Sequence, residues 1–529
     1  MKLVLSEKTN KNINLLKNAL SKIPLPVVII LLMIPLRFIN LGYSEYICDE
    51  SVALDWLRVN KSFYPADFFI SLHKGPMQYL VGGLVFLINR DVFNELAYRI
   101  PFALTSCISI AFFYLFIKNL TKNKFTAFFT AMLFGVNGLL VAFGRIFQYQ
   151  SLNLLFSILA LYFYSEITKI VEDSSQTNEN KILRNSLIGT LFFCLSLLSH
   201  WDAIYILPFI FLVLLRDVLL KKSLPSKFKI KFILLNFLII AILFSVYLIP
   251  YIRYFINSSE NQAYFQGRVS PSLITFSKFA RRVKFIIFRI KLYNPLVFFE
   301  FHLFLLFVSL LFIKKTYFYV LWFISEIFIF TLIFTNPGTH IYNIFIPLLT
   351  CISLGVTYLL NIPIKSKKIN KNLIKKVTQI VLLFLVSFLY YQSYVIFVNH
   401  NPEYPWKKKS VLGFEIGNFT NEERAEYLAN HKIGFPLRRE WKQIEFILRD
   451  YEKSNDIRIG ETKIHSNENS CPVRFYTGRE TSVSGDRYVV AVRYPLSLVN
   501  DYKRFYKFNN KISLESAVNM YGDTTAKIY

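Results

Sequence analysis

Residues 232–251 read FILLNFLIIAILFSVYLIPY and contain no charged side chain. An apolar helix of about 20 residues is long enough to cross the hydrocarbon core of a membrane, so this stretch predicts a transmembrane helix. Ten further apolar runs are long enough to span, or nearly so, near 24–43, 101–118, 125–143, 148–168, 186–199, 203–220, 295–313, 316–334, 342–361 and 377–397. We therefore expect an all-α polytopic membrane protein with eleven spanning helices.

The composition excludes the other broad classes of protein. Of the 529 residues, 54% are hydrophobic, 17% are aromatic and only 18% are charged, whereas about 25% charged residues are usual in soluble domains. Such a chain is neither a soluble multidomain enzyme nor a disordered polypeptide. The net charge of +27 does not indicate nucleic-acid binding, because the cytoplasmic loops of membrane proteins collect Lys and Arg.

The distribution of basic residues predicts how the chain crosses the membrane. Residues 1–23 hold five lysines and no small-residue cleavage site follows them, which favours a cytoplasmic N-terminus over a signal peptide. The apolar stretch 76–89 is too short to span, and if it is interfacial or re-entrant, the Lys-rich loops after it all face the cytoplasm. This topology places a large first outer loop at 44–100 on the outside of the cell membrane, together with residues 398–529.

The carboxy-terminal residues 398–529 differ from the rest of the chain. They are rich in charge and contain no spanning run, and their length suffices for a small extracytoplasmic α/β domain. An amphipathic helix is expected at 439–453, with strands at 456–464, 473–476 and 487–493. Within this domain residues 436–441 are either part of an acceptor-binding surface or, more simply, the start of that helix.

Five cysteines do not form an evident disulfide framework. Cys107, Cys194 and Cys351 fall inside apolar runs, where cysteine usually serves as a small hydrophobic residue. Cys48 and Cys471 are the pair that could meet outside the bilayer, but the pattern does not predict that they do.

One outer loop departs from the usual charge distribution. Residues 251–295 hold eight Lys or Arg against one acid, Glu260, and their apolar residues recur at helical spacing with Lys278, Arg282 and Arg289 on the opposite face. This pattern predicts an amphipathic helix lying in the membrane interface. Such a helix would either adhere to anionic headgroups or form a basic wall beside a site for a lipid phosphate.

Candidate catalytic residues gather in the first outer loop. Asp49-Glu50 follows the first apolar run, His73-Lys74-Gly75-Pro76 comes later in the loop, and Arg99-Ile100-Pro101 begins the next long run. An acid pair, a Lys and an Arg thus meet at the lip of the bilayer. A two-residue acid motif is common by chance, so it is this context that makes the pair a candidate site.

The order Asp-Glu, His-Lys-Gly-Pro and Arg-Ile-Pro-Phe-Ala-Leu resembles the GT-C glycosyltransferases, in particular dolichyl-phosphate-mannose–protein mannosyltransferases and bacterial aminoarabinose (lipid A) transferases. The motifs cover roughly residues 1–220, and beyond them the resemblance is one of architecture. It implies that 24–397 form a transmembrane transferase domain. The family moves a sugar from a polyprenyl-phosphate carrier to a protein, lipid or glycan acceptor on the outer face of the membrane.

The resemblance also implies roles for individual residues. Asp49 is expected to be the base that takes the proton of the acceptor hydroxyl, with Glu50 assisting it. Lys74, Arg99 and Arg145 are expected to stabilise the negative charge of the departing lipid phosphate. Two further donor-binding residues are His340 and Tyr342, and possible substrate-binding residues are His73, Gln148, His200 and Asp202.

Two departures from the family pattern affect these expectations. Lys-Gly-Pro replaces Lys-Pro-Pro, which keeps the cation and loosens the turn. The second outer loop, Gly144–Gln150, offers amides after Arg145 where relatives often have an Asp. We therefore predict no divalent metal and no other cofactor.

Other functions remain as alternatives. Glu326 lies within an apolar run, and intramembrane acids often mark transport pathways, so the first alternative is a transporter or flippase of lipid-linked sugars. A transporter should show paired intramembrane charges or a pseudo-repeat, whereas here the polar groups cluster at one lip. A non-catalytic scaffold gives no reason for Asp49, Lys74 and Arg99 to converge. The expected function is an inverting, polyprenyl-phosphate-sugar-dependent glycosyltransferase.

Overall fold

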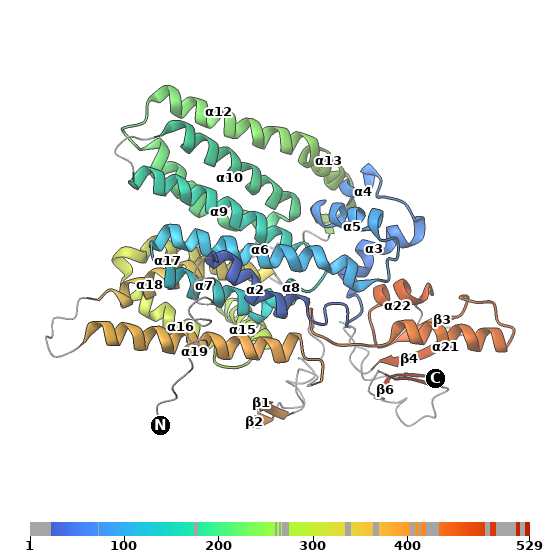
Figure 1. Ribbon diagram of the computed structural model, residues 1–529. Coiled ribbons are helices and arrows are strands. Elements are labelled where there is room, and N and C mark those ends of the chain that lie inside the picture. Colours follow the sequence, from blue (N-terminus) through green and yellow to red (C-terminus); the bar gives the residue numbers. More distant parts are fainter. Residues whose placement is uncertain are drawn as a thin grey trace, which may run out of the picture.

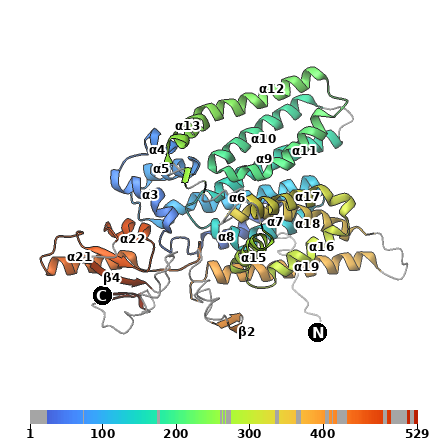
Figure 2. The same cartoon turned by 180° about the vertical axis from the view of Figure 1, so that it is seen from behind.

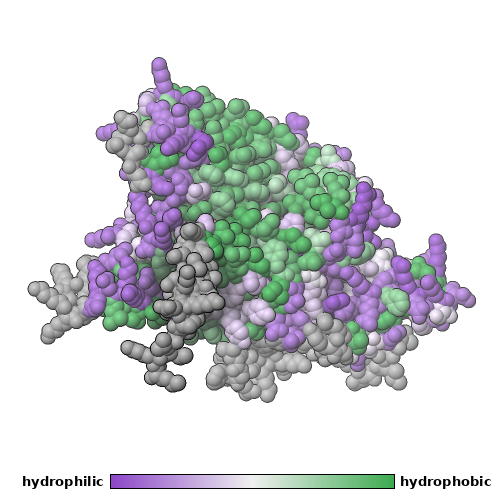
Figure 3. Space-filling view, viewed as in Figure 1, coloured by the Kyte–Doolittle hydropathy of each residue, from purple (hydrophilic) through white to green (hydrophobic). Residues whose placement is uncertain are grey.

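The computed structural model describes residues 23–71, 74–173, 178–259, 262–263, 266, 275–333, 340–362, 370–401, 408–411, 414–418, 433–481, 487–492, 515–518 and 524–529. Its helices form a long bundle, and a small domain with a β-sheet sits at one end of it (Figure 1). On the face seen in Figure 3, hydrophobic residues cover the middle of the bundle and hydrophilic residues gather at its two ends. The protein is a multi-pass membrane protein, as predicted.

Seven helical segments of the described chain are long and apolar enough to cross a membrane. They are α6 (Glu95–Thr121), α9 (Gln150–Asp173), α10 (Glu179–Ser199), α12 to α13 (Ser226–Asn257), α17 with η4 (Ile313–Leu332), η5 with α18 (His340–Leu360) and α19 (Lys371–Phe397). An eighth is possible if α15 (Phe276–Tyr293) and α16 (Phe298–Leu310), which are bent by 117°, count as one span.

The other three predicted spans are helical but short or interrupted. They correspond to α2 (Leu25–Phe38), to α7 (Lys124–Val136) with α8 (Gly138–Phe143), and to η1 (Trp201–Ile206), α11 (Leu207–Val213) and η2 (Leu214–Leu219). Between α7 and α8, the side chain of Asn137 accepts the Leu139 N–H and caps a new helix, which interrupts the run as N-caps do. The count of eleven therefore stays a prediction.

The first outer loop folds into three short helices, α3 (Cys48–Asn60), α4 (Ala66–Ile70) and α5 (Met77–Ile88). These lie together at the end of the bundle that also holds the small domain (Figure 1). At 12 residues, α5 is about 18 Å long, which is too short to cross a membrane, in agreement with the sequence analysis.

The helix predicted within 251–295 is α15, which packs against α8 in front of the bundle (Figure 2). The expectation that Arg282 and Arg289 lie on its outer polar face is wrong. Their exposed fractions are 8% and 3%, and Arg282 Nη1 donates to the carbonyl of Thr331 at 2.7 Å. Arg282 turns inward because η4 (Ile329–Ile333) ends there with carbonyls that need donors. Arg289 lies over the ring of Phe285, 4.9 Å from its centre.

The small domain contains a four-stranded sheet of order β3-β4-β6-β5, in which β3 pairs with β4 in parallel and the other pairs are antiparallel. The strands are β3 (Lys463–Ser466), β4 (Arg487–Val492), β5 (Glu515–Val518) and β6 (Thr524–Ile528), and a separate hairpin joins β1 (Lys408–Val411) to β2 (Phe414–Asn418). The helix α21 (Trp441–Ser454) and the strand β4 agree with the predictions.

Two predicted strands of this domain are wrong in whole or in part. Residues 473–476 lie in a helix, α22 (Ser470–Thr477), and 456–464 become a strand only at their end, in β3. A segment of four residues, three of them apolar or aromatic, is too short for its periodicity to separate strand from helix. Helix α22 forms because it packs against α3 of the first outer loop.

The small domain is bound tightly to the first outer loop. Glu45 accepts hydrogen bonds from the backbone N–H groups of Arg439 (2.9 Å) and Glu440 (2.6 Å), and so caps α21. Residues 436–441 are consequently a helix start, and their side chains are largely buried, which disfavours the acceptor-surface alternative. Cys48 and Cys471 form a disulfide with a Cα–Cα distance of 5.0 Å, a pairing that the sequence analysis did not favour.

The Glu45 cap leads to a first prediction. Glu45→Gln keeps the shape of the side chain but replaces charge-assisted hydrogen bonds by neutral ones, so we expect the protein to lose about 1.5–3 kcal/mol of stability. Thermal unfolding in detergent would show a lower melting temperature. The matched control is Glu461→Gln, which alters an exposed ion pair with Arg458 and should change the melting temperature very little.

Candidate functional site

Asp49 and Lys74 form the entrance to the site. Asp49 lies in the first turn of α3, and its carboxylate is 3.1 Å from Lys74 Nζ. Its side chain is 47% exposed, whereas that of Lys74 is 21% exposed. Gln148 Nε2 donates a hydrogen bond to Asp49 Oδ2. The partial positive charge at a helix N-terminus stabilises negative charge there, so the end of α3 favours a carboxylate at this position.

Aromatic rings connect Lys74 to a second polar group. Lys74 Nζ lies 5.6 Å from the centre of the Tyr149 ring, within the range of a cation–π interaction. The Tyr149 ring stacks on the imidazole of His200 with centroids 4.1 Å apart. The Tyr149 hydroxyl is also 3.5 Å from His340 Nδ1. Lys74 therefore lies between the exposed carboxylate of Asp49 and a buried histidine cluster.

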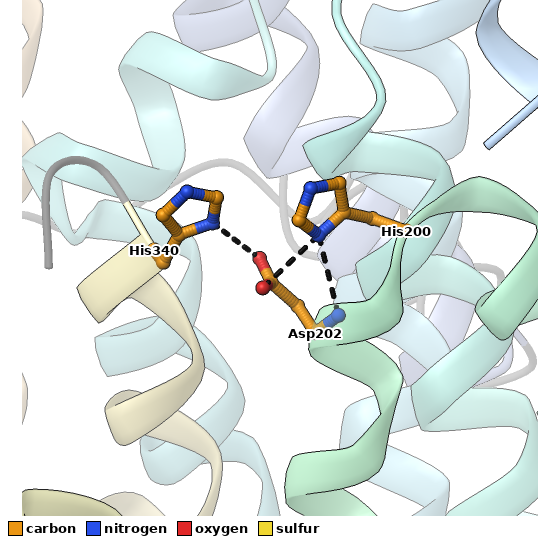
Figure 4. Close-up of side chains that lie close together, drawn as sticks. All are labelled: His200, Asp202 and His340. Carbon is orange, nitrogen blue, oxygen red and sulfur yellow. Dashed lines mark hydrogen bonds and ion pairs between the residues drawn. The ribbon is translucent and has the colours of Figure 1, made fainter. Parts of the chain in front are cut away.

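That cluster consists of His200, Asp202 and His340, with the carboxylate between the two imidazoles (Figure 4). His200 Nδ1 is 3.0 Å from Asp202 Oδ1, and His340 Nδ1 is 2.9 Å from Oδ2. The Tyr342 hydroxyl donates to the same Oδ2 at 2.9 Å. Residues 200 and 202 flank the start of η1, whereas 340 and 342 lie in η5 (His340–Ile344), so the cluster joins two helix ends that are far apart in sequence.

Burial and charge set the protonation states in this cluster. Burial lowers the pKa of His200 to about 4, an effect that Asp202 opposes in part, so His200 is neutral at pH 7. Burial by itself would raise the pKa of Asp202, but the adjacent imidazoles hold it well below its usual value. The cluster therefore presents a buried carboxylate beside the neutral ring of His200 and hydrogen bonded by the Tyr342 hydroxyl, an arrangement suited to binding hydroxyl groups.

Glu50 is not at the entrance, although it is adjacent to Asp49. Its carboxylate is fully buried and forms a two-pronged ion pair with Arg99, at 2.9 Å to Nε and 2.8 Å to Nη2. The same carboxylate accepts the backbone N–H groups of Ile47 (3.0 Å) and Phe147 (2.6 Å). Arg99 is 1% exposed and also donates to the carbonyl of Ser44. Both side chains are already saturated by protein partners, so their positions do not support the assisting role expected of Glu50 or the phosphate role expected of Arg99, and both roles stay predictions.

Arg145 is also occupied elsewhere. Its guanidinium donates to the carbonyls of Leu36 (3.0 Å), Ile39 (2.9 Å) and Asn40 (3.1 Å), and it is 5% exposed. These carbonyls end α2, where cations and N–H donors are stabilising. Arg145 therefore holds the chain that leads into the first outer loop, and the expectation that it contacts a lipid phosphate is not supported by its position.

Gly75 explains how Lys74 comes near His200. A Cβ atom at residue 75 would overlap the carbonyl oxygen of Leu198, near the end of α10. Glycine lets two backbones approach more closely than any other residue. The glycine of Lys-Gly-Pro is thus required by packing, where the sequence indicated only a looser turn.

The structure places two residues near the site that the sequence analysis missed, and it does not describe one residue that the sequence analysis named. Trp201 is 40% exposed, and its ring lies 5.1 Å from that of His200 and 5.5 Å from that of His340. Tyr149 was also missed, although it stands between two glutamines that were noted as amides. Its aromatic ring between polar residues was the available signal. His73 lies outside the described residues.

A metal ion has one candidate position among the residues that the structure describes. The ligand atoms of His200, Asp202 and His340 lie within 4.8 Å of one another, and imidazole nitrogens with a carboxylate oxygen suit Zn²⁺. Both oxygens of Asp202 already face imidazoles, so an ion would have to replace those contacts. The sequence could not group these three residues because they come from separate segments.

Comparisons with known proteins relate the chain to one family of enzymes. Residues 73–249, about a third of the chain, match the family model described as dolichyl-phosphate-mannose-protein mannosyltransferase. The chain is a membrane glycosyltransferase that is similar, over these residues, to enzymes that use lipid-linked sugar donors. The matched region covers Lys74, Arg99, Tyr149, His200 and Asp202, and ends before His340. No curated protein sequence matches the chain.

Three solved structures have a partly similar course of the chain. ArnT from Cupriavidus metallidurans bound to undecaprenyl phosphate is 9% identical, with 95% of this chain and 97% of that chain covered and a TM-score of 0.49. The apo state of the same protein is also 9% identical, with 99% of this chain and 98% of that chain covered and a TM-score of 0.44. The protein O-mannosyltransferase Pmt1-Pmt2 complex of S. cerevisiae is 14% identical, with 47% of this chain and 35% of that chain covered and a TM-score of 0.33. All three TM-scores lie below 0.5, so the family assignment rests on the sequence match.

The buried ion pair of this glycosyltransferase gives a second prediction. Glu50→Gln leaves the Arg99 guanidinium buried without its counter-charge, so we expect a loss of about 3–5 kcal/mol of stability. Asp49→Asn is the matched comparison, since its carboxylate is half exposed, and it should leave the melting temperature nearly unchanged. Equal melting temperatures for the two variants in detergent would contradict the assignment of Glu50 to a structural role.

The close approach at Gly75 gives a third prediction. Gly75→Ala should destabilise the protein by about 1–3 kcal/mol through overpacking, and should lower turnover by moving Lys74 away from Tyr149. Gly189→Ala is the control, because a Cβ there would meet a movable tyrosine ring, Tyr164 Cε2, at 3.0 Å. If Gly75→Ala has the turnover and the melting temperature of the wild type, the packing argument is refuted.

Proposed function

We propose that this glycosyltransferase transfers a sugar from a polyprenyl-phosphate carrier to an acceptor hydroxyl on the outer face of the cell membrane, with inversion at the anomeric carbon and Asp49 as the base. The observation that carries this proposal is the Asp49–Lys74 pair, in which a half-exposed carboxylate and a cation lie 3.1 Å apart. The acceptor is a protein, a lipid or a glycan.

Asp49 is suited to be the base because it is accessible. A general base must lie within hydrogen-bond reach of the proton that it removes and contributes about 10²–10⁴-fold to the rate. Glu50, its neighbour, has no free carboxylate oxygen for this task. One base suffices for an inverting transfer, because a phosphate leaving group departs without being protonated.

Lys74 is suited to bind the departing phosphate. Negative charge grows on the lipid phosphate as the glycosidic bond breaks, and a fixed cation stabilises this charge where it develops. Among the three cations considered for this role, Lys74 faces the entrance, whereas the guanidinium groups of Arg99 and Arg145 are bound to protein groups. Those two residues would act by holding the first outer loop in place.

The sugar would occupy the space beside the histidine cluster. His200, Asp202, His340 and Tyr342 offer donors and acceptors to sugar hydroxyls, and the half-exposed ring of Trp201 offers an apolar face for the C–H bonds of a pyranose or furanose. Gln148 would orient Asp49. In this proposal the cluster acts by hydrogen bonding, and no metal or other cofactor takes part.

The proposed topology puts residues 1–23 in the cytoplasm, the transferase domain at 24–397 and an extracytoplasmic domain at 398–529. The support is the position of α3, α4, α5 and the small domain at one end of the bundle (Figure 1), opposite the Lys-rich loops. A disulfide between 48 and 471 is typical of an oxidising compartment. Residues 1–22 lie outside the described residues.

The alternative of a transporter for lipid-linked sugars has less support. Glu326 is buried in α17 (Ile313–Phe328), and no described cation forms an ion pair with it. The polar residues of the site gather near one end of the bundle. A transport pathway needs polar groups or broken helices near the middle of the membrane, on both halves of the protein.

Turnover of radiolabelled polyprenyl-phosphate sugars in proteoliposomes tests the function. We expect Asp49→Asn to lower sugar transfer by at least about 10²-fold, with retained donor binding, and Lys74→Gln to weaken donor binding as well. The control is Asp55→Asn on the same helix, whose carboxylate pairs with Arg58 away from the entrance, and which should stay active.

Other outcomes would reject parts of this proposal. Full activity of Asp49→Asn would remove Asp49 as the base. Movement of labelled lipid across the bilayer without sugar release would favour the transporter. A product that retains the anomeric configuration would show that the transfer is not a single displacement.

A further inference from the structure

Asp49 is the exposed residue in a segment that is otherwise held on all sides. Within residues 41–50, all of which the structure describes, only Asp49 is exposed. Its neighbour Glu50 is fixed by Arg99, and its neighbour Cys48 is fixed by the disulfide to Cys471. The position of the carboxylate is therefore set by the contacts of the residues on either side of it.

Helix α22 of the small domain provides several of these contacts. The backbone N–H of Tyr46 donates to the hydroxyl of Tyr476 at 2.8 Å, and that hydroxyl donates to Glu95 Oε1 at 2.8 Å. The ring of Phe475 packs edge-on against Tyr46, with centroids 5.6 Å apart. Tyr476 thus ties the chain just before Asp49 to the start of α6.

Helix α21 holds the same segment from its other side. Its first N–H groups are capped by Glu45, and the Arg439 guanidinium donates to the Glu45 carbonyl and pairs with Glu468 at 3.1 Å. Arg439 is 1% exposed. Lys442 adds an ion pair with Glu95 at 2.8 Å. Side chains of α21 and α22 share one hydrophobic core with α3.

The disulfide joins this unit to the residue directly before Asp49. It links positions 423 residues apart in the sequence, so it closes a loop that contains most of the membrane domain. Arg474 of α22 pairs with Asp55 one to two turns further along α3, at 3.2 Å. The Arg474 side chain is 58% exposed, so this pair contributes little, and the disulfide is the contact that fixes the first turn of α3.

We propose that residues 433–481, which include α21 and α22, form a clamp that positions Asp49 for catalysis. The Cys48–Cys471 disulfide closes this clamp, so reduction of the disulfide lowers turnover. This inference rests on the proposed role of Asp49. Cys48, Cys471 and Tyr476 are positioning residues, because they act through the disulfide at Cys48 and the hydrogen bond to the Tyr46 backbone. A displacement of about 1 Å at a reacting group can lower a rate by about 10²-fold.

Reduction of the clamp is a defined chemical step. A dithiol reductant transfers two electrons and two protons to the Cys48–Cys471 bond, which gives two thiols, and the reductant itself becomes a cyclic disulfide. Since Cys107, Cys194 and Cys351 are free and buried, the reagent would act on this one bond among the described residues.

A purely structural disulfide would behave differently from a clamp. A disulfide stabilises a protein mainly by restricting the unfolded chain, so its loss lowers the melting temperature but leaves the kcat of the folded enzyme unchanged. A clamp on Asp49 predicts that kcat falls at temperatures where the protein is fully folded, while the KM for the donor changes little, because Lys74 and the histidine cluster are held by other contacts.

The first experiment compares oxidised and dithiothreitol-reduced wild-type protein in proteoliposomes, well below the melting temperature of each form. We expect kcat to fall at least about tenfold on reduction, the donor KM to stay within about twofold, and reoxidation to restore the rate. An unchanged kcat in protein shown by mass spectrometry to be reduced would overturn the inference.

Variants provide matched controls. Cys471→Ser, Cys48→Ser and the double variant should show the same lowered kcat, since each removes the same bond, and none should respond to reductant. Arg474→Gln removes only the ion pair with Asp55 on the same helix face, and should keep a kcat within about twofold of wild type and remain sensitive to reductant. Sensitivity of the double variant to reductant would contradict the assignment.

A readout without turnover separates this inference from the proposed function. Hydrogen exchange of the peptide covering 44–60 should be faster in the reduced protein, whereas peptides of α9 and α10 should be unchanged. If no donor is turned over but exchange increases as described, the proposed function fails and with it the catalytic purpose of the clamp, whereas the disulfide is still shown to hold residues 44–60 in place. If the isolated protein carries no Cys48–Cys471 bond, or if exchange at 44–60 is unaffected by reduction, the clamp is refuted.

Discussion

The buried ion pair between Glu50 and Arg99 is the contact on which the site depends. Two buried charges are tolerated only when each is neutralised and fully hydrogen bonded, and here Glu50 binds Arg99 together with the N–H groups of Ile47 and Phe147. These partners come from the start of α3, from α6 and from the second outer turn. One carboxylate therefore joins three segments at one end of the bundle.

The same pair decides what Asp49 can do. Adjacent residues in a helix point about 100° apart, so turning Glu50 into the core leaves Asp49 facing the opening, beside Lys74. Gly75 brings Lys74 against the end of α10, and thereby near the cluster of His200, Asp202 and His340. The accessible acid of this glycosyltransferase, its cation and its hydrogen-bonding cluster are thus consequences of packing between helix ends.

The small domain belongs to this arrangement and is not merely appended to the bundle. Its helices α21 and α22 share a core with α3, and Glu45 completes the N-terminus of α21. An unpaired helix end and a buried Arg439 would each be unfavourable without that contact. The first outer loop and the carboxy-terminal domain therefore stabilise each other at the place where the chemistry is proposed to occur.

The sequence by itself determined the class of the protein and the segments of the site. Long apolar runs identify membrane helices because the bilayer imposes a length and a composition, and the order of short motifs led to Asp49, Lys74, His200, Asp202 and His340. Local pattern could not show that Asp49 is exposed and Glu50 buried, nor that Lys74 lies beside Asp49 while Arg99 and Arg145 are bound to other protein groups, because all of them are charged residues near helix ends. It also gave the wrong structure for 473–476 and did not predict the Cys48–Cys471 pair. Those outcomes depend on which groups lie next to one another after folding, and burial, ion pairing and close backbone approach between distant segments exist only in the tertiary structure.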